Sequence, residues 1–486
     1  MPHPGRGRGG PATNTINDFE RALAAVLRRC VPGVREITAC RRLSGGASQE
    51  TYAIDIDTAE GARRVALRRA PGGELEATSY GRPGLEVEAR LMTLARAAGV
   101  PEPEVMHVLE PADGLGAGFV MSWVEGETLG ARIARHDDFA GVRPRLARQC
   151  GEVLARIHAI DVSANELDGV LETLDPETFV RRQWQQYQAF GTPQPMIDYT
   201  ARWLLANLPR SRGLALVHND FRNGNLIVTP DEGIVAVLDW EVAHIGDPMR
   251  DLGWICTNSW RFGVSAREVG GFGDLDDLVA GYEAVSGTTV DRDAVHFWQV
   301  FGSFWWAVGC LTMFAHHRDG TERSAERPAI GRRSSECQVD CVNLLIPGPV
   351  ALPNADSPLL PESDMPRTEE ILEAVREFLR EDVSAETSGR TRFIARVAAN
   401  ALDIVSRELA LGPAQAAAEQ RRLERLLGAH GTLDELRARL CGRLRAGEFA
   451  LDDTALTEHL RETAVARLAV DQPNYSGFAT ACAAGA

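Results

Sequence analysis

The sequence predicts an α+β fold of two lobes, with an antiparallel sheet in the N-terminal lobe and mostly helices in the second, followed by a small all-α helical bundle. Short strand-like segments separated by turn residues fill the first part of the chain. Helical periodicity prevails later, and a proline-rich stretch precedes the last group of amphipathic helices. The expected boundaries are a disordered tail at 1–18, lobes at 19–124 and 125–346, a linker at 347–367, the bundle at 368–470 and a tail at 471–486.

The length and composition fit a multidomain protein. Its 486 residues, 44% hydrophobic and 25% charged, suffice for two or three domains with their own cores. A formal net charge of −16 argues against a general nucleic-acid binder, which presents a basic surface. The most apolar helix candidate, residues 301–314, is shorter than the ~20 residues of a membrane span. The Gly- and Pro-rich start lacks the apolar core of a signal peptide. We therefore expect neither nucleic acid nor a membrane as partner.

Nine cysteines are scattered along the chain, without a close CxxC pair or a His cluster of zinc spacing. Reduced cysteines in a cytoplasmic protein are the simplest interpretation. Cys337 and Cys341 share a helix face at their spacing of four, and packing is their expected role. A packed core face is also favoured for a group of helically spaced aromatics, with the lining of an acyl or aromatic substrate as the alternative: Phe297, Phe301, Phe304 and Trp305.

A glycine-rich turn joins two segments of strand character in residues 41–54, RRLSGGASQETYAI. Such a turn lets backbone amides approach phosphate groups closely. Gly-Gly pairs are also common in ordinary turns, so this turn is informative only together with the segments that follow. The candidate nucleotide-binding residues here are Ser44, Gly45, Gly46 and Ser48.

The next strand-like segment, RVALR at residues 64–68, occupies the place at which protein kinases carry Val-Ala-Ile-Lys. Arg68 therefore stands where a nucleotide-binding Lys is expected, and a guanidinium can hold phosphate oxygens through two hydrogen bonds. Arg69 could share the task. Residues 85–98 have helical spacing, and Glu88 could extend from this helix as the ion-pair partner of Arg68, with Glu86 as its competitor.

A further strand is predicted at residues 118–124, GFVMSWV, after GVPEP at residues 99–103 has ended the helix. In a two-lobed fold this strand leads to the hinge between the lobes. The backbone groups of Ser122 and Val124 could meet adenine there, which makes both residues candidate ATP contacts.

The strongest functional signal lies in residues 217–254, VHNDFRNGNLIVTPDEGIVAVLDWEVAHIGDPMRDLGW. Asp220 follows an apolar, strand-like run, so its carboxylate is expected on a loop at the end of a strand. Asn225 comes five positions later. A β-hairpin is then predicted around the turn TPDEG, and it delivers Asp239.

This spacing is typical of phosphoryl transfer, which needs a carboxylate to orient the attacking hydroxyl and oxygen ligands to hold Mg²⁺ on the phosphates. Asp220 fits the first role, and Asn225 and Asp239 fit the second. The alternative is that these are ordinary loop residues, because Asp and Asn favour turns. The complete, ordered set of Asp220, Asn225, hairpin and Asp239 argues against that alternative.

The run HNDFRNGN, followed by LDWE and GDPMRDLGW, resembles the aminoglycoside phosphotransferase and choline kinase superfamily, whose members are protein-kinase-like, two-lobed enzymes acting on small molecules. The resemblance implies that Asp220 is the catalytic base, that Asn225 and Asp239 are the magnesium ligands, and that ATP and Mg²⁺ are the cofactors. It also implies that His218 braces the catalytic loop. The chain has Asn219 where the family usually has Gly.

Other stretches, including VALRRAPGG, FVMSWVEGETL and LARIHAIDV, extend the likeness over about residues 19–346. They are similar to the phosphotransferase domain of acyl-CoA dehydrogenase family members 10 and 11, in which Arg is common at the Lys position. Activities in that group include phosphorylation of hydroxyacyl-CoA compounds. The resemblance therefore implies a hydroxyacyl-CoA or related hydroxy-acid metabolite as the small-molecule hydroxyl acceptor. The alternatives are an aminoglycoside-type antibiotic phosphotransferase and a non-catalytic nucleotide-binding pseudokinase.

The proline-rich stretch 347–367 reads as an extended linker, because repeated proline is incompatible with a helix or an inner strand. Five amphipathic helices are predicted after it: from residue 368, at 392–409, at 414–427, at 433–444 and at 453–468. This bundle resembles a helical domain of unknown function, most clearly in RFIARVAANALDIVSREL. Partner binding, formation of a homo-oligomer or covering of the cleft are the expected roles, rather than a second active site.

Overall fold

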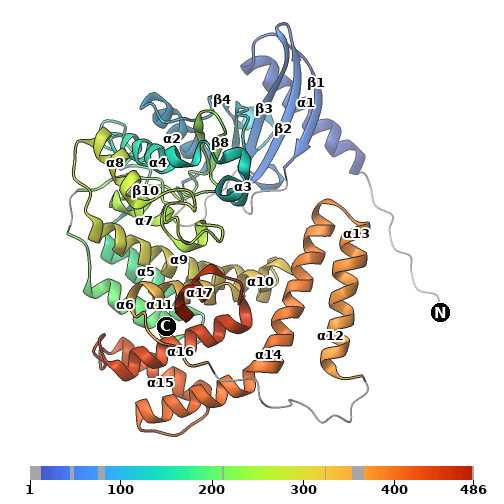
Figure 1. Cartoon of the computed structure of the whole chain (residues 1–486). Helices are drawn as coiled ribbons and strands as arrows, with labels where there is room; N and C mark the ends of the chain where they lie inside the picture. The colour runs from blue at the N-terminus through green and yellow to red at the C-terminus, as the bar shows by residue number, and fades with distance from the viewer. Residues whose placement is uncertain are drawn as a thin grey trace, which may run out of the picture.

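The N-terminal lobe is built on a five-stranded antiparallel sheet with the strand order β1-β2-β3-β5-β4 (Figure 1). The structure is a computed structural model, which describes residues 12–43, 49–74, 83–210, 213–322, 324–352 and 366–483. The strands are β1 (Val34–Arg42), β2 (Glu50–Thr58), β3 (Gly61–Arg69), β4 (Val105–Val108) and β5 (Gly118–Ser122). The predicted antiparallel N-terminal sheet is therefore confirmed.

Two helices cover opposite faces of this sheet: α1 (Ala12–Cys30) and α2 (Leu85–Ala97). Alternate residues of β3 show the two sides, because Val65 and Leu67 pack in the core with α1, whereas Ala66 packs with α2. Helix α1 begins inside the stretch for which the sequence predicts a tail, and its apolar side joins the sheet core.

The second lobe is mostly helical, as predicted. Its helices are α3 (Gly130–Arg135), α4 (Arg143–His158), α5 (Pro176–Ala189), α6 (Pro195–Ala206), α7 (Met249–Ile255), α8 (Leu275–Ser286), α9 (Arg292–Arg318), α10 (Glu326–Arg332) and α11 (Ser334–Leu345). Short 3-10 turns are η1 (Pro71–Gly73) and η2 (Pro111–Asp113) in the N-terminal lobe, and η3 (Asp137–Phe139) and η4 (Asn258–Trp260) in the second lobe. A small sheet joins β6 (Thr173–Leu174), β10 (His244–Gly246) and β7 (Ala215–Val217), and the predicted hairpin pairs β8 (Leu226–Thr229) with β9 (Gly233–Val237).

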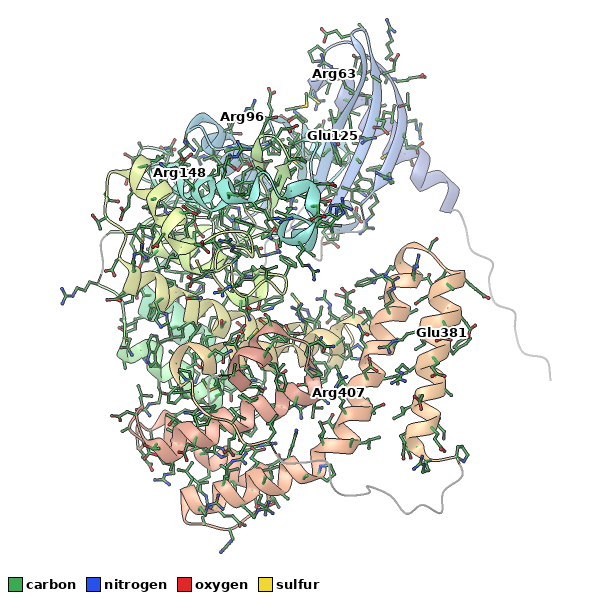
Figure 2. The ribbon with its side chains drawn as sticks, in the orientation of Figure 1. Arg63, Arg96, Glu125, Arg148, Glu381 and Arg407 are labelled. Carbon is green, nitrogen blue, oxygen red and sulfur yellow. The ribbon has the colours of Figure 1, made fainter. Side chains whose placement is uncertain are left out.

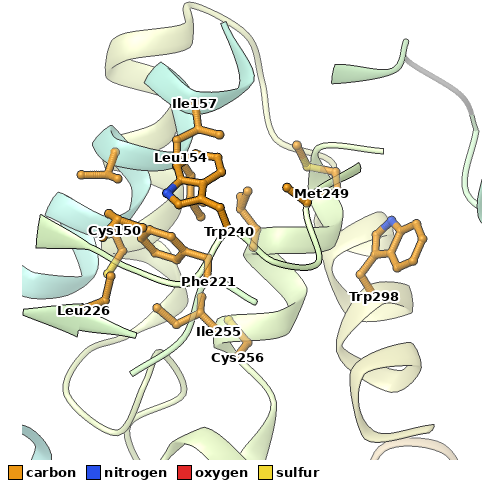
Figure 3. Packing of buried hydrophobic residues seen from close by; sticks show 14 of the residues in the cluster. Cys150, Leu154, Ile157, Phe221, Leu226, Trp240, Met249, Ile255, Cys256 and Trp298 are labelled. Atoms are coloured by element: carbon orange, nitrogen blue, oxygen red, sulfur yellow. The ribbon is translucent and has the colours of Figure 1, made fainter. Parts of the chain in front are cut away.

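The core of the second lobe lies directly behind the loop that follows β7 and carries Asp220. Phe221 and Trp240, both 0% exposed, pack against Cys150 and Leu154 of α4, and Trp298 of α9 belongs to the same cluster (Figure 3). The aromatic residues of α9 at 297, 301 and 304 are buried in this cluster, as the packing interpretation predicts, whereas Trp305, the fourth residue of the predicted core face, packs against it and is only partly buried. These large buried aromatic side chains form a densely packed core, which holds the loop that follows β7 in place.

The C-terminal helices are α12 (Thr368–Glu377), the π-helical segment η5 (Phe378–Val383), α13 (Ser384–Glu386), α14 (Gly389–Leu427), α15 (Leu433–Arg445), α16 (Thr454–Asp471) and α17 (Ser476–Ala483). Helix α14 continues through Pro413, where the sequence predicts two separate helices. Proline costs one helical hydrogen bond, but α14 packs on both α12 and α16 (Figure 1). Helix α17 lies within the predicted C-terminal tail.

The C-terminal helices share a hydrophobic core with the second lobe. One buried cluster combines Tyr199 of α6 and Val342 of α11 with Leu440 of α15 and Leu460 of α16. The chain therefore does not end in an independent bundle on a tether. The α12–α14 hairpin projects away from this core (Figure 2). Further along α14, the side chain of Arg407 donates to the carbonyl group of Val470 on α16 at 2.6 Å.

No helix in the described ranges has the length and apolar character that a membrane crossing requires. Cys337 and Cys341 are buried free thiols on α11, as the packing interpretation predicts.

Candidate active site

Asp220 lies on the loop that follows β7, and three side chains hold its carboxylate. The Asn225 side-chain amide donates to the Asp220 carbonyl at 3.0 Å and to its Oδ2 at 2.6 Å. Arg222 Nε lies 3.0 Å from Oδ1, and Trp254 Nε1 donates to the same oxygen at 2.9 Å. These donors fix both carboxylate oxygens, so the group is oriented before any substrate arrives.

Two groups brace this loop from behind. The imidazole of His218 is fully buried, accepts a 3.3 Å hydrogen bond from the Asp220 amide through Nδ1, and packs on Trp240. Burial lowers the pKa of His218, so the ring is neutral at neutral pH. Asp251 accepts from the amides of His218 at 2.9 Å and Asn219 at 2.7 Å, and lies 3.1 Å from His158 Nε2. Burial acts to raise the pKa of Asp251, but His158 and these amides lower it overall.

Asn219 stands where the family usually has glycine, and the structure shows how the loop accommodates its side chain. Its φ angle is +68°, a left-handed conformation that Asn tolerates better than most residues with a side chain. The side chain also adds contacts that Gly cannot make. Its Nδ2 donates to the Val242 carbonyl at 3.2 Å, and its Oδ1 accepts from Arg250 Nε at 3.0 Å. The substitution thus preserves the backbone turn and ties the loop to α7.

Arg68, in the place of the expected Lys, is bound by two carboxylates. Its Nε lies 3.1 Å from Glu88 of α2, and its Nη2 lies 2.6 Å from Asp239. Glu88 is 1% exposed and burial raises its pKa to about 7, although Arg68 acts in the opposite direction. Burial alone lowers the pKa of Arg68, but Glu88, Asp239 and Glu241 reverse this and raise it. The Arg68–Glu88 pair is ionised, because the guanidinium keeps its charge and lies within hydrogen-bond distance of the Glu88 carboxylate.

The predicted Arg68–Glu88 ion pair is therefore confirmed, and the structure contradicts both competitors. Glu86 is exposed on the outer face of α2. Arg69 points to the opposite face of the sheet, because successive residues of a strand alternate. There it binds Glu50 at 2.9 Å and lies over the ring of Phe19.

Asn225 and Asp239 are brought together by the backbone, since the Leu238 amide donates to the Asn225 carbonyl at 2.8 Å. The side-chain nitrogen of Asn225 donates to Asp220, and the side-chain oxygen of Asn225 is therefore available to coordinate a cation. Asp239, with a φ angle of +75°, presents a carboxylate. A carboxylate and an amide oxygen suit Mg²⁺, which is usually held by few protein ligands together with phosphates and water. Within the described residues no cluster of three or more His, Cys, Asp or Glu forms a separate metal site.

The other predicted nucleotide residues divide into two groups. Ser44, Gly45, Gly46 and Ser48 lie outside the described residues. On either side of the stretch that contains them, the Leu43 amide donates to the Thr51 carbonyl at 2.8 Å. Ser122 and Val124 lie at the end of β5 and just beyond it, where the chain passes to the second lobe. The Ser122 amide donates a hydrogen bond to the Glu104 carbonyl at 2.8 Å. Their contact with adenine stays a prediction.

Four tryptophans form a contiguous group, here called the aromatic wall (Trp254, Trp260, Trp305 and Trp306), and one of them, Trp254, contacts Asp220. The ring of Trp254 is 4.9 Å from that of Trp305 and 5.1 Å from that of Trp260, which lies 5.5 Å from Trp306. The guanidinium of Arg222 lies 4.3 Å from the centre of the Trp260 ring.

Sequence reasoning assigned no role to Arg222, Trp254 or Trp260. The only available signal was that all three stand inside stretches that carry the family resemblance, HNDFRNGN for Arg222 and RDLGWICTNSWRFG for both tryptophans. Trp254 and Trp260 occupy adjacent elements, α7 and η4, and their approach to Asp220 follows from tertiary packing.

The fold and this site define a class of protein: a two-lobed, kinase-like phosphotransferase. Residues 39–287, just over half of the chain, match the Phosphotransferase enzyme family, and the chain belongs to that family. Residues 385–475 match a Domain of unknown function (DUF6285).

The chain is also similar to two curated proteins and to one solved structure. Acyl-CoA dehydrogenase family member 10 of Mus musculus is 33% identical over 222 residues, covering 43% of this chain and 19% of that protein. Family member 11 of Gallus gallus is 32% identical over 263 residues, covering 50% and 32%. The matches thus span at most about a third of these relatives. A solved Ralstonia eutropha protein, described as a candidate aminoglycoside phosphotransferase, superposes with a TM-score of 0.54 at 24% identity, over 67% of this chain and 97% of that one.

Proposed function

We propose that this protein transfers the γ-phosphoryl group of ATP to a hydroxyl of a small molecule in a Mg²⁺-dependent reaction, and that the acceptor is a hydroxyacyl-CoA or a related hydroxy-acid metabolite. The observation that carries the proposal is the fixed carboxylate of Asp220, which lies on the loop that also supplies Asn225. Asp220 orients the acceptor hydroxyl and receives its proton.

The remaining residues bind and orient the nucleotide. Asn225 and Asp239 hold Mg²⁺, and the bound cation neutralises charge on the phosphates. Arg68 carries charge from the sheet lobe to the same region and is held in place by Glu88. Backbone groups of Ser44, Gly45, Gly46 and Ser48 cover the phosphates, and those of Ser122 and Val124 meet adenine.

The acceptor class is supported by the surroundings of Asp220. Arg222 and Trp254 contact its carboxylate, and Trp260, another member of the aromatic wall, lies against both side chains. An arginine beside apolar rings suits an acceptor with anionic oxygens and an apolar portion, whereas a polycationic aminoglycoside requires acidic partners. The names of the relatives, acyl-CoA dehydrogenase family members, agree with a thioester substrate. The geometry of Arg68 speaks against the pseudokinase alternative, because Arg68 makes the ion pair that active kinases form through Lys.

The test is ATP consumption with two acceptor panels, hydroxyacyl-CoA thioesters and aminoglycosides, with phosphorylated products identified by mass spectrometry. A phosphorylated thioester supports the proposal. A phosphorylated aminoglycoside overturns the acceptor class and keeps the chemistry. If MgATP binds but no acceptor of either panel is phosphorylated, the pseudokinase alternative replaces it.

A further inference from the structure

The C-terminal domain touches the second lobe close to the catalytic loop through one short segment, residues 475–477. The hydroxyl of Tyr475 donates to Asp340 Oδ2 on α11 at 2.7 Å. The other oxygen of that carboxylate, Oδ1, accepts from Asn258 Nδ2 at 2.8 Å. Ser476 Oγ completes the group by donating to Asn258 Oδ1 at 3.3 Å. Asp340, which is 3% exposed, therefore joins the C-terminal segment to the η4 turn.

This segment is closely seated rather than loosely apposed. A Cβ atom at Gly477 would lie 2.7 Å from Asp340 Oδ1, so only glycine permits this approach of the backbone. The carbonyl oxygen of Gly477 accepts from Asn343 Nδ2 at 2.9 Å. Figure 1 shows α17, which begins here, lying over the second lobe near α9 and α11.

From the η4 turn, direct contacts lead to the catalytic carboxylate. Trp260 is the last residue of η4 and is 8% exposed. The guanidinium of Arg222 stacks on its ring at 4.3 Å, and Arg222 Nε lies 3.0 Å from Asp220 Oδ1. The same ring packs edge-on against Trp254, which donates to that oxygen. The position of Trp260 thus bears on two of the three side chains that orient Asp220.

We propose that the C-terminal domain is a positioning element of the active site: Tyr475 and Ser476 hold η4, and through Trp260 they fix Arg222 and the acceptor side of Asp220. Tyr475, Asn258 and Asp340 are positioning residues, since they act through Trp260 and Arg222 and do not touch Asp220. The proposal rests on the proposed function in assigning the acceptor to this side. It gives a role in the phosphotransfer reaction to a segment that begins at Tyr475, the last residue that matches the domain of unknown function.

The test compares two Tyr→Phe variants of the full chain, each of which removes one hydroxyl from the same domain interface. Tyr475→Phe removes the bond to Asp340. Tyr199→Phe is the matched control, because its hydroxyl donates to the Leu451 carbonyl at 2.8 Å and it lies on α6, away from η4. Both proteins are labelled with 5-fluorotryptophan, and the ¹⁹F resonance of Trp260 is assigned from its absence in Trp260→Phe.

The expected result is that Tyr475→Phe shifts or broadens the Trp260 resonance and lowers kcat with the acceptor by ~5-fold, the loss expected from one hydrogen bond, with the KM for MgATP unchanged. Tyr199→Phe leaves both quantities at their wild-type values. An unchanged Trp260 resonance in Tyr475→Phe, or equal changes in both variants, overturns the proposal. If Tyr475→Phe does not fold, Ser476→Ala removes the second contact and is judged in the same way.

Failure of the proposed function is separable from failure of this inference. If the wild-type protein phosphorylates no acceptor, the function is overturned, whereas the Trp260 resonance still decides whether the C-terminal segment positions η4.

Discussion

Arg68 of β3 and Asp239, which follows β9, are joined by a hydrogen bond of 2.6 Å although 171 residues separate them. The same guanidinium binds Glu88 of α2. The sheet lobe, its helix and the loop that carries Asp239 are therefore connected through one side chain. This connection makes the charge and the shape of Arg68 separately testable.

Replacement of Arg68 separates charge from geometry. Arg68→Ala leaves Glu88 and Asp239 without their cation, and we expect the affinity for MgATP to fall by at least ~50-fold, a loss typical of a broken buried charge pair. Arg68→Lys keeps one charge but cannot make both contacts, so a loss of ~3–10-fold is expected. Isothermal titration with MgATP measures both affinities. Equal affinities for wild type and Arg68→Ala would contradict a nucleotide-binding role.

Loss of the catalytic carboxylate should affect turnover and spare nucleotide binding. We expect Asp220→Ala to lower kcat by ~10²–10⁴-fold, the usual contribution of a general base, because no other carboxylate is held by Asn225 and Trp254. MgATP affinity should stay within ~3-fold of the wild-type value. Steady-state kinetics and titration on the same preparation give both numbers. Retained turnover in this variant would refute the assignment of Asp220.

Removal of the metal site should affect nucleotide binding itself. Asp239→Ala deletes a proposed Mg²⁺ ligand together with the partner of Arg68. The expected result is that ATP no longer raises the melting temperature in the presence of Mg²⁺. In the wild-type protein, EDTA should abolish the same increase. A wild-type increase that persists in EDTA would show that ATP binds without the metal.

Sequence patterns were sufficient where the functional groups follow regular elements. Strand alternation and the glycine turns predicted the N-terminal sheet, and Asp220, Asn225 and Asp239 follow β7 and flank the β8–β9 hairpin as expected. The choice between Glu88 and Glu86 required the structure, because both lie in the first turns of α2 and only the sheet's position decides which one is buried. Strand alternation alone could have excluded Arg69 once Arg68 was assigned to the inner face.

Contacts between distant segments were not predictable. Helical periodicity could not show that α14 runs through Pro413, because proline removes a helical hydrogen bond and no local pattern records the packing of α14 on α12 and α16. Nor did it indicate that the C-terminal helices share a core with α6 and α11. Trp260 and Tyr475 acquire their roles from positions over 200 residues apart, and no local pattern records such an approach.

The docking of the C-terminal domain should depend on one buried ion pair. Asp198 is 0% exposed and accepts from Arg445 Nε at 2.8 Å and from Trp184 Nε1 at 2.6 Å. Arg445→Ala leaves that carboxylate buried without its cation, so we expect the free energy of unfolding to fall by about 2 kcal/mol, less than for a fully buried pair because Arg445 is partly exposed. Urea unfolding measures it. The control Arg439→Ala, at an exposed site on the same helix, should cost less than about 0.5 kcal/mol.

Asp340 should give the protein a distinct dependence of stability on pH. Burial raises its pKa to about 7, Glu336 adds to this, and Tyr475, Asn258 and Arg261 oppose it. An acid whose pKa is higher in the folded than in the unfolded state stabilises the protein fully below the unfolded value, about 4, and loses that contribution as pH rises toward 7. The carboxylate therefore costs stability on the order of a few kcal/mol above pH 7 relative to pH 4.

Asp340→Asn isolates this effect, because an amide keeps the shape and can accept from Asn258 while donating to the Tyr475 hydroxyl. We expect the free energy of unfolding of the wild-type protein, relative to Asp340→Asn, to decrease between pH 4 and pH 7 and to level off above pH 7. Urea unfolding of both proteins across this range gives the difference, from which all other titrating groups cancel. Two parallel profiles would show that the carboxyl of Asp340 ionises in the folded protein as it does in the unfolded chain.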